Sequence, residues 1–167
     1  ESVWYLVLHP FGLAHLRSHI SFGAGAPGWA TSVAVVLQAV LVLAVVAAAA
    51  RARSVAAAVA LAGVTPAVFL LTNRIFSPQF MVTVTVALAV AGALVLTTAR
   101  KQLALGLALM GATLANAFVY PFALPHYAVT WQICSVALFA LALGAAVWIV
   151  FQAALLSSRG SPRAADR

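Results

Sequence analysis

The sequence predicts an all-α membrane protein, with about five transmembrane helices preceded by an interfacial or re-entrant helix. Hydrophobic residues make up 65% of the 167 residues and charged residues only 7%, against about 45–50% and about 25% in soluble domains. A soluble fold of this size would leave much of that apolar surface in water. The sequence also lacks the alternating polar and apolar segments of about ten residues that a transmembrane barrel requires. Helices in a bilayer are therefore the expected fold.

Residues 1–29 are expected to form an outer interfacial segment and a linker. The apolar run within Ser2–Leu16 is interrupted by Pro10 and Gly12, so it is too short to cross a bilayer. Trp4 and Tyr5 are typical of headgroup depth. The glycine-rich residues 21–28 are expected to link this segment to the first span.

Five apolar runs within residues 30–155 are long enough for transmembrane helices, which need about 20 residues. They are Ala30–Ala50, Ser54–Leu71, Phe80–Ala99, Leu103–Phe122 and Trp131–Leu155. Short basic turns at 51–53 and 100–102 make helical hairpins of the first two and of the third and fourth runs. Residues 156–167, rich in Ser, Gly, Pro and Arg, are expected to be a disordered basic tail.

The distribution of basic residues predicts the orientation of the chain in the cytoplasmic membrane. Seven of the nine lie in the two basic turns and the tail: Arg51, Arg53, Arg100, Lys101, Arg159, Arg163 and Arg167. The positive-inside rule assigns that side, with the C-terminus, to the cytoplasm. The net charge of +7 thus follows from membrane topology and predicts no nucleic-acid partner, because no basic stripe marks a folded face.

Residues 73–80 form a polar interruption on the predicted outer side. The chain has two carboxylates, Glu1 and Asp166, and Asp166 lies on the other side of the membrane, so Arg74 has at most one acidic partner in this chain. A guanidinium binds phosphate bidentately, although an arginine extending to lipid phosphates is the alternative.

The next three residues open the third predicted span. Pro78 suits a first helical turn and Ser77 is expected to be the N-cap. Free N–H groups at this helix start would add to the attraction for an anion. Neither the N-cap at Ser77 nor the first-turn position of Pro78 explains why residue 79 is a glutamine.

The run 74–80, RIFSPQF, resembles the vFSPQY segment of the polyprenyl-phosphate-dependent glycosyltransferases of the GT-C superfamily, glycosyltransferase family 87. Residues 1–4, ESVW, are similar to the end of the R-x-L-Q-x-E-S segment of that family. Phe80 departs from the usual tyrosine, and Met81–Val84 lacks the tryptophan and proline that often follow. The resemblance implies transfer of a sugar, often mannose, from a polyprenyl-phosphate donor to a glycolipid or glycan acceptor outside the cytoplasmic membrane.

The resemblance also suggests which residues contact the donor phosphate or sugar. Arg74, Gln79 and Ser77 are the first candidates, and Glu1 and His15 are weaker ones. The superfamily uses an aspartate on the first outer loop as base, and this chain has no aspartate outside its tail. The chain is therefore expected to be an inactive C-terminal portion without a catalytic residue of its own, embedded among membrane lipids and using no metal or cofactor.

Two other functions remain open from the sequence. A transporter or channel component is disfavoured because the five predicted spans contain no charged residue for coupling ions. A membrane scaffold without chemistry is the other alternative. The polar residues within spans, such as Gln38, Thr113 and Asn116, are expected to form interhelical hydrogen bonds.

Overall fold

The computed structural model describes residues 3–11, 28–73, 76–119 and 128–159, and these parts of the chain are helical and contain no strand. A short helix α1 (Val3–Leu8) and a 3₁₀ turn η1 (His9–Phe11) come first. The long helices are α2 (Gly28–Arg51), α3 (Val55–Leu71), α4 (Phe80–Val95), α5 (Ala99–Ala117) and α6 (Ala128–Arg159). The all-α prediction is confirmed for the described residues.

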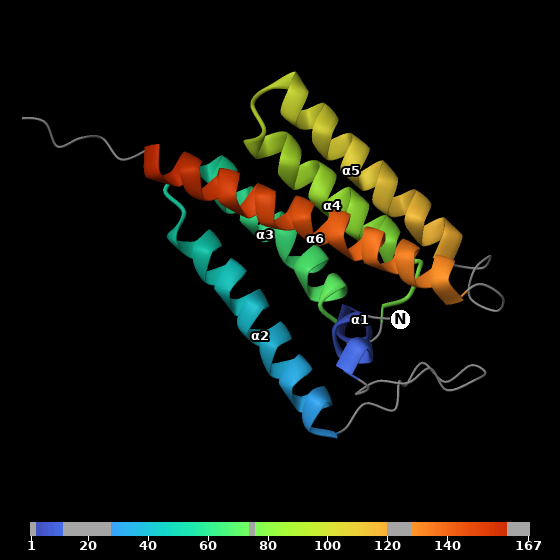
Figure 1. The fold of residues 1–167 in the computed structure, drawn as a ribbon. Coiled ribbons are helices and arrows are strands. Elements are labelled where there is room, and N and C mark those ends of the chain that lie inside the picture. The colour runs from blue at the N-terminus through green and yellow to red at the C-terminus, as the bar shows by residue number, and fades with distance from the viewer. Residues whose placement is uncertain (1–2, 12–27, 74–75, 120–127, 160–167) are drawn as a thin grey trace, which may run out of the picture.

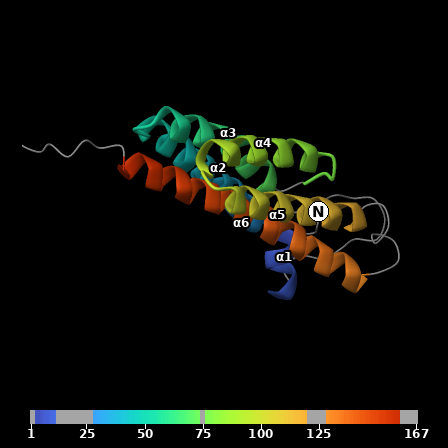
Figure 2. The same ribbon diagram turned by 90° about the horizontal axis from the view of Figure 1, so that it is seen from above.

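The long helices run in alternating directions, with α3 at the centre of the bundle (Figures 1 and 2). Helix α3 packs against α2, α4 and α6, while α5 packs against α4 and α6. The α2–α3 turn, the α4–α5 turn and the end of α6 lie at one end of the bundle (Figure 1). A hydrogen bond of 2.9 Å from Lys101 Nζ to Gln152 Oε1 joins α5 to α6 there. The basic turns therefore share one end, which we call the basic end.

Two helices are long and apolar enough to cross a membrane by length and composition. They cover Thr31–Arg51 and Gln132–Ser158, with mean hydropathies of 2.8 and 2.5. Helices α3 and α4 are apolar but contain only 17 and 16 residues. Helix α5 contains the charged pair Arg100 and Lys101 in its first turn, which lowers its hydropathy. The structure thus supports two candidate spans directly, fewer than the five expected.

The boundary between α4 and α5 differs from the prediction. Helix α4 ends at Val95 instead of continuing to Ala99, and α5 begins at Ala99 instead of Leu103. The reason is an N-cap: the Thr98 hydroxyl accepts a hydrogen bond of 3.4 Å from the backbone N–H of Lys101. Such a cap satisfies an N–H group that lacks a helical partner. The two basic residues of the expected turn therefore lie inside the first turn of α5.

The last helix is longer than predicted at both ends. Helix α6 runs from Ala128 to Arg159, so residues 156–159, which the sequence assigned to a disordered tail, are helical. The Ser158 hydroxyl donates a hydrogen bond of 2.9 Å to the Leu155 carbonyl oxygen. This contact lies within the last turn and gives the hydroxyl a partner that is compatible with helix.

Small residues allow the helices of the core to approach closely. Ala57, Ala60 and Ala67 of α3 are fully buried, as is Ala91 of α4. Gly92 is tighter still, because a Cβ at this position would overlap the Cδ2 atom of Leu105. Close backbone approach at small residues is the usual way in which helices associate in lipid, where van der Waals contact dominates.

Helix α1 contacts the bundle at the end opposite to the basic end. It packs against α6, and Trp4 Nε1 donates a hydrogen bond of 2.6 Å to the carbonyl oxygen of Thr72. That oxygen belongs to the C-cap of α3, where carbonyl groups lack helical partners. The sequence predicted headgroup depth for Trp4, and the structure adds a protein partner for its indole.

Candidate functional site

The polar residues Ser77–Gln79 form a turn that leads into α4, at the end of the bundle opposite to the basic end. The Ser77 hydroxyl donates a hydrogen bond of 2.6 Å to Gln79 Oε1. The Gln79 side chain is exposed, and its Nε2 atom carries two N–H donors. The turn therefore presents an amide whose oxygen is already engaged and whose nitrogen can donate to a ligand.

Two predictions about this turn are wrong. The N-cap of α4 is Gln79, not Ser77, and no side chain caps it. The N–H groups of Phe80, Met81 and Val82 donate to the carbonyl oxygens of the turn, at 2.9, 3.1 and 3.3 Å. Bonds from residue i to i−3 tighten a helix end in this way. The helix start thus uses these N–H groups itself, and the side chains remain as the donors available to an anion.

Phe76 anchors the turn in the core. Its ring is 1% exposed and makes edge-to-face contacts with Phe80, at 6.3 Å between centroids, and with Phe139 of α6, at 5.2 Å. Phe139 lies eleven residues after Ala128, the first residue of α6, which corresponds to about 16 Å along a helix. The turn is therefore level with the interior of α6, well below the start of that helix.

Asn116, near the end of α5, holds the turn from the other side. Its Nδ2 donates a hydrogen bond of 3.1 Å to the carbonyl oxygen of Pro78. Its Oδ1 is buried and has no hydrogen-bond partner among the described residues. Buried acceptors are usually satisfied, so this oxygen costs free energy as it stands and could accept from a ligand only after the turn opens. The sequence predicted only a structural role for Asn116, although a polar amide in an apolar run is itself a functional signal.

The structure brings together only part of the predicted site. Ser77 and Gln79 contact each other, and Asn116 joins them through Pro78. Arg74, Glu1 and His15 lie outside the described residues, so their predicted donor contacts stay predictions. Within the described parts, no group of three His, Cys, Asp or Glu residues is arranged as metal ligands.

Polar side chains elsewhere in the bundle have interhelical partners. Gln38 Nε2 donates a hydrogen bond of 2.8 Å to the carbonyl oxygen of Phe69, which joins α2 to α3. The hydroxyl oxygens of Thr85 and Thr113 lie 3.4 Å apart between α4 and α5. The prediction of interhelical hydrogen bonds is confirmed for Gln38 and Thr113, whereas Asn116 bonds to the turn before α4.

Comparisons with protein-family models, with curated proteins and with solved structures found no match for this chain.

Proposed function

We propose that this chain is the membrane-embedded C-terminal part of a glycosyltransferase that uses a polyprenyl-phosphate donor. It would transfer a sugar, with mannose expected, to a glycolipid or glycan acceptor on the outer side of the cytoplasmic membrane. Arg74 and the Gln79 amide would contact the donor phosphate or its sugar. Glu1 and His15 are weaker candidates for the same contacts, and the base would come from outside this chain.

The arrangement of Ser77, Gln79 and Asn116 is the observation that carries the proposal. A leaving phosphate needs hydrogen-bond donors that are already oriented, and Gln79 Nε2 has its partner oxygen fixed by Ser77 at 2.6 Å. Asn116 holds the turn in place through its hydrogen bond to the Pro78 carbonyl oxygen. A preoriented amide donor on an anchored turn suits the phosphate of a lipid-linked sugar donor.

We infer further that α2–α6 all cross the bilayer, with the basic end in the cytoplasm. Helices α3 and α4, at 17 and 16 residues, are about 25 Å long, slightly less than a hydrocarbon core of about 30 Å. Locally thinner lipid or flanking side chains accommodate such a difference at modest cost. Exposed apolar side chains on these helices, such as Val59, Val82 and Val86, then face lipid and not water. The turn at Ser77–Gln79, at the start of α4, would then lie on the outer side of the bilayer, about three helical turns below the first residue of α6.

The test is photolabelling of the full chain in proteoliposomes with a photoreactive polyprenyl phosphate. We expect crosslinks concentrated in residues 73–80, and competition by unlabelled polyprenyl phosphate but not by the uncharged polyprenol. Gln79→Leu and Arg74→Ala should each lower the labelling about tenfold or more, as expected for lost hydrogen bonds to a charged group.

Arg53→Ala is the matched control, because Arg53 is exposed and belongs to the α2–α3 turn, which lies at the opposite end of the bundle (Figure 1). It should leave labelling unchanged. Labelling spread evenly along the helices, or equal labelling of Gln79→Leu and the unsubstituted chain, would refute the proposal. A membrane scaffold without chemistry predicts the even distribution.

A further inference from the structure

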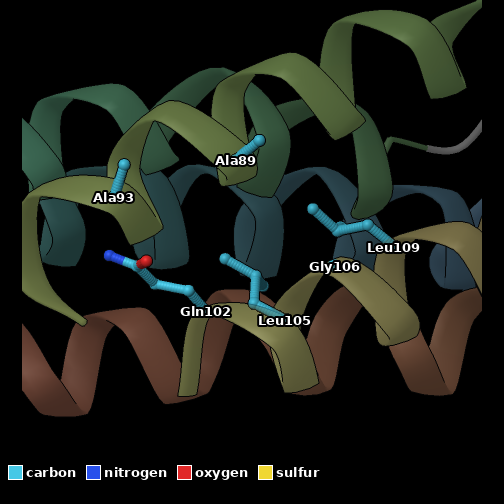
Figure 3. A pocket seen from close by; sticks show the side chains of 6 residues that line it. All are labelled: Ala89, Ala93, Gln102, Leu105, Gly106 and Leu109. Carbon is cyan, nitrogen blue, oxygen red and sulfur yellow. The ribbon is translucent and has the colours of Figure 1, made fainter. Parts of the chain in front are cut away.

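The two connections that flank α4 are held in place by different kinds of contact. At the basic end, Gln102 Nε2 donates a hydrogen bond of 3.0 Å to the carbonyl oxygen of Leu96, and the Thr98 hydroxyl caps the N–H of Lys101. The Gln102 side chain lies beside α4, where it lines the same groove as Ala93 (Figure 3). The connection from α4 to α5 is therefore fixed by contacts between residues close together in the sequence.

The connection from α3 to α4 is instead fixed by residues from other helices. Asn116 of α5 donates to the Pro78 carbonyl oxygen at 3.1 Å, and Phe139 of α6 packs against the ring of Phe76. Both contacts hold the part of the connection that leads into α4. The start of the connection, at the α3 C-cap Thr72, is held from outside α3 by a third residue.

That residue is Trp4 of α1. Its indole Nε1 donates a hydrogen bond of 2.6 Å to the Thr72 carbonyl oxygen. The last carbonyl groups of a helix have no helical donor, and the hydrocarbon of a bilayer supplies no water to replace one. The N–H and the hydroxyl of Thr72 bond backward to the Val68 carbonyl oxygen, at 3.0 and 2.6 Å. The indole thus adds a contact from another helix at the residue where the chain leaves α3.

Helix α1 is itself held on the bundle by one face. Val3 and Leu6 are partly buried against the core, and residues three positions apart share a face of a helix. Val7 and Phe11, by contrast, are 52% and 75% exposed. A helix of six residues is too short to be stable alone, so the contacts with the core keep the indole in place.

We propose that Trp4 is a positioning residue for the polar turn that carries Gln79. Its N–H group holds the start of the connection at Thr72. The bond from Asn116 to Pro78 holds the other end, so the two contacts together orient the Gln79 amide. The consequence for a polyprenyl-phosphate donor rests on the function proposed above, whereas the effect on the turn does not.

The first test is amide hydrogen exchange of the full chain in lipid nanodiscs without any donor. Trp4 is replaced by phenylalanine, or by β-(3-benzothienyl)alanine, which keeps the size of the indole but has sulfur in place of its N–H. In both variants we expect the peptide covering residues 76–82 to exchange about twofold to tenfold faster, the effect of one net hydrogen bond. This peptide reports on the turn because the first three N–H groups of α4 donate to carbonyl oxygens of the turn. The peptide covering residues 96–102, whose contacts are local, should exchange at an unchanged rate.

Labelling by the photoreactive polyprenyl phosphate gives the second readout. Both Trp4 variants should raise the concentration needed for half-maximal labelling of residues 73–80 by about the same factor, with the maximal yield unchanged. A loss of folded protein would instead lower the yield and leave that concentration unchanged. The two quantities therefore separate positioning of the turn from a general loss of structure.

Trp29→Phe is the matched control, because Trp29 of α2 is 57% exposed, and it should change neither readout. Unchanged exchange of residues 76–82 in the Trp4 variants would overturn the proposal. Equally accelerated exchange of residues 96–102 would also overturn it, because it indicates general destabilisation, and so would an unchanged half-maximal concentration. If the unsubstituted chain is not labelled at all, the proposed function fails, and hydrogen exchange alone decides the role of Trp4.

Discussion

Replacing Phe76 by leucine tests whether the polar turn is held by aromatic contacts in the core. The ring is 1% exposed and makes two edge-to-face contacts, at interplanar angles of 83° with Phe80 and 69° with Phe139. Each such pair contributes about 0.5–1.5 kcal/mol beyond burial, so the two together give about 2 kcal/mol. Leucine keeps most of the apolar volume but loses both aromatic contacts. We therefore expect the free energy of unfolding to fall by about 2 kcal/mol.

Thermal unfolding of the purified chain in detergent measures this change. For a chain of this length about 2 kcal/mol corresponds to a decrease in Tm of about 4–8 °C. Phe151→Leu is the control, because Phe151 on α6 is 58% exposed and a substitution at an exposed position changes stability by only about 0.5 kcal/mol. Equal changes in Tm for the two variants would show that the ring of Phe76 does not anchor the turn, and the packing argument would be wrong.

Two further substitutions address the contacts between α4 and α5. Asn116→Ala removes the hydrogen bond of 3.1 Å to the Pro78 carbonyl oxygen, which keeps its bond from the Met81 N–H. We therefore expect a loss of about 0.5–1.5 kcal/mol, measured by thermal unfolding, with faster proteolysis at the Ser77–Gln79 turn. An unchanged cleavage rate would contradict the anchoring role. Gly92→Ala should lower Tm by only a few degrees, because its Cβ overlaps the Cδ2 atom of Leu105 and this side-chain end can change rotamer at a cost of about 0.5–1.5 kcal/mol. Gly106→Ala, where an added Cβ meets open space, is the matched control, and a decrease in Tm as large as that of Gly92→Ala would refute the close packing.

The helices could be predicted from the sequence because their signals are local. Apolar runs bounded by basic or glycine-rich segments predicted each long helix to within a few residues. The clearest boundary error concerned α5, which begins at Ala99. The positive charges of Arg100 and Lys101 are unfavourable near a helix N-terminus. The cap formed by the Thr98 hydroxyl and the Lys101 N–H stabilises this helix start by more than those charges cost.

The candidate site was predicted only in part. The composition of residues 73–80 marked it, since an amide, a hydroxyl and a guanidinium are costly in an apolar chain. The role of Ser77 was predicted wrongly, because its hydroxyl binds the Gln79 side chain at 2.6 Å and not the helix backbone. Both alternatives are local hydrogen bonds of similar strength, and residue types alone give no basis for choosing between them.

The sequence by itself determined which residues are helical and which helix ends carry positive charge. Only the tertiary structure decided the partners of these segments: Asn116 meets Pro78 across 38 residues, and Trp4 meets Thr72 across 68. The reason is that apolar periodicity reports that a face is buried but not what covers it. For helices in lipid the ambiguity is greater, because acyl chains are as apolar as leucine side chains and close packing of small residues selects the neighbour.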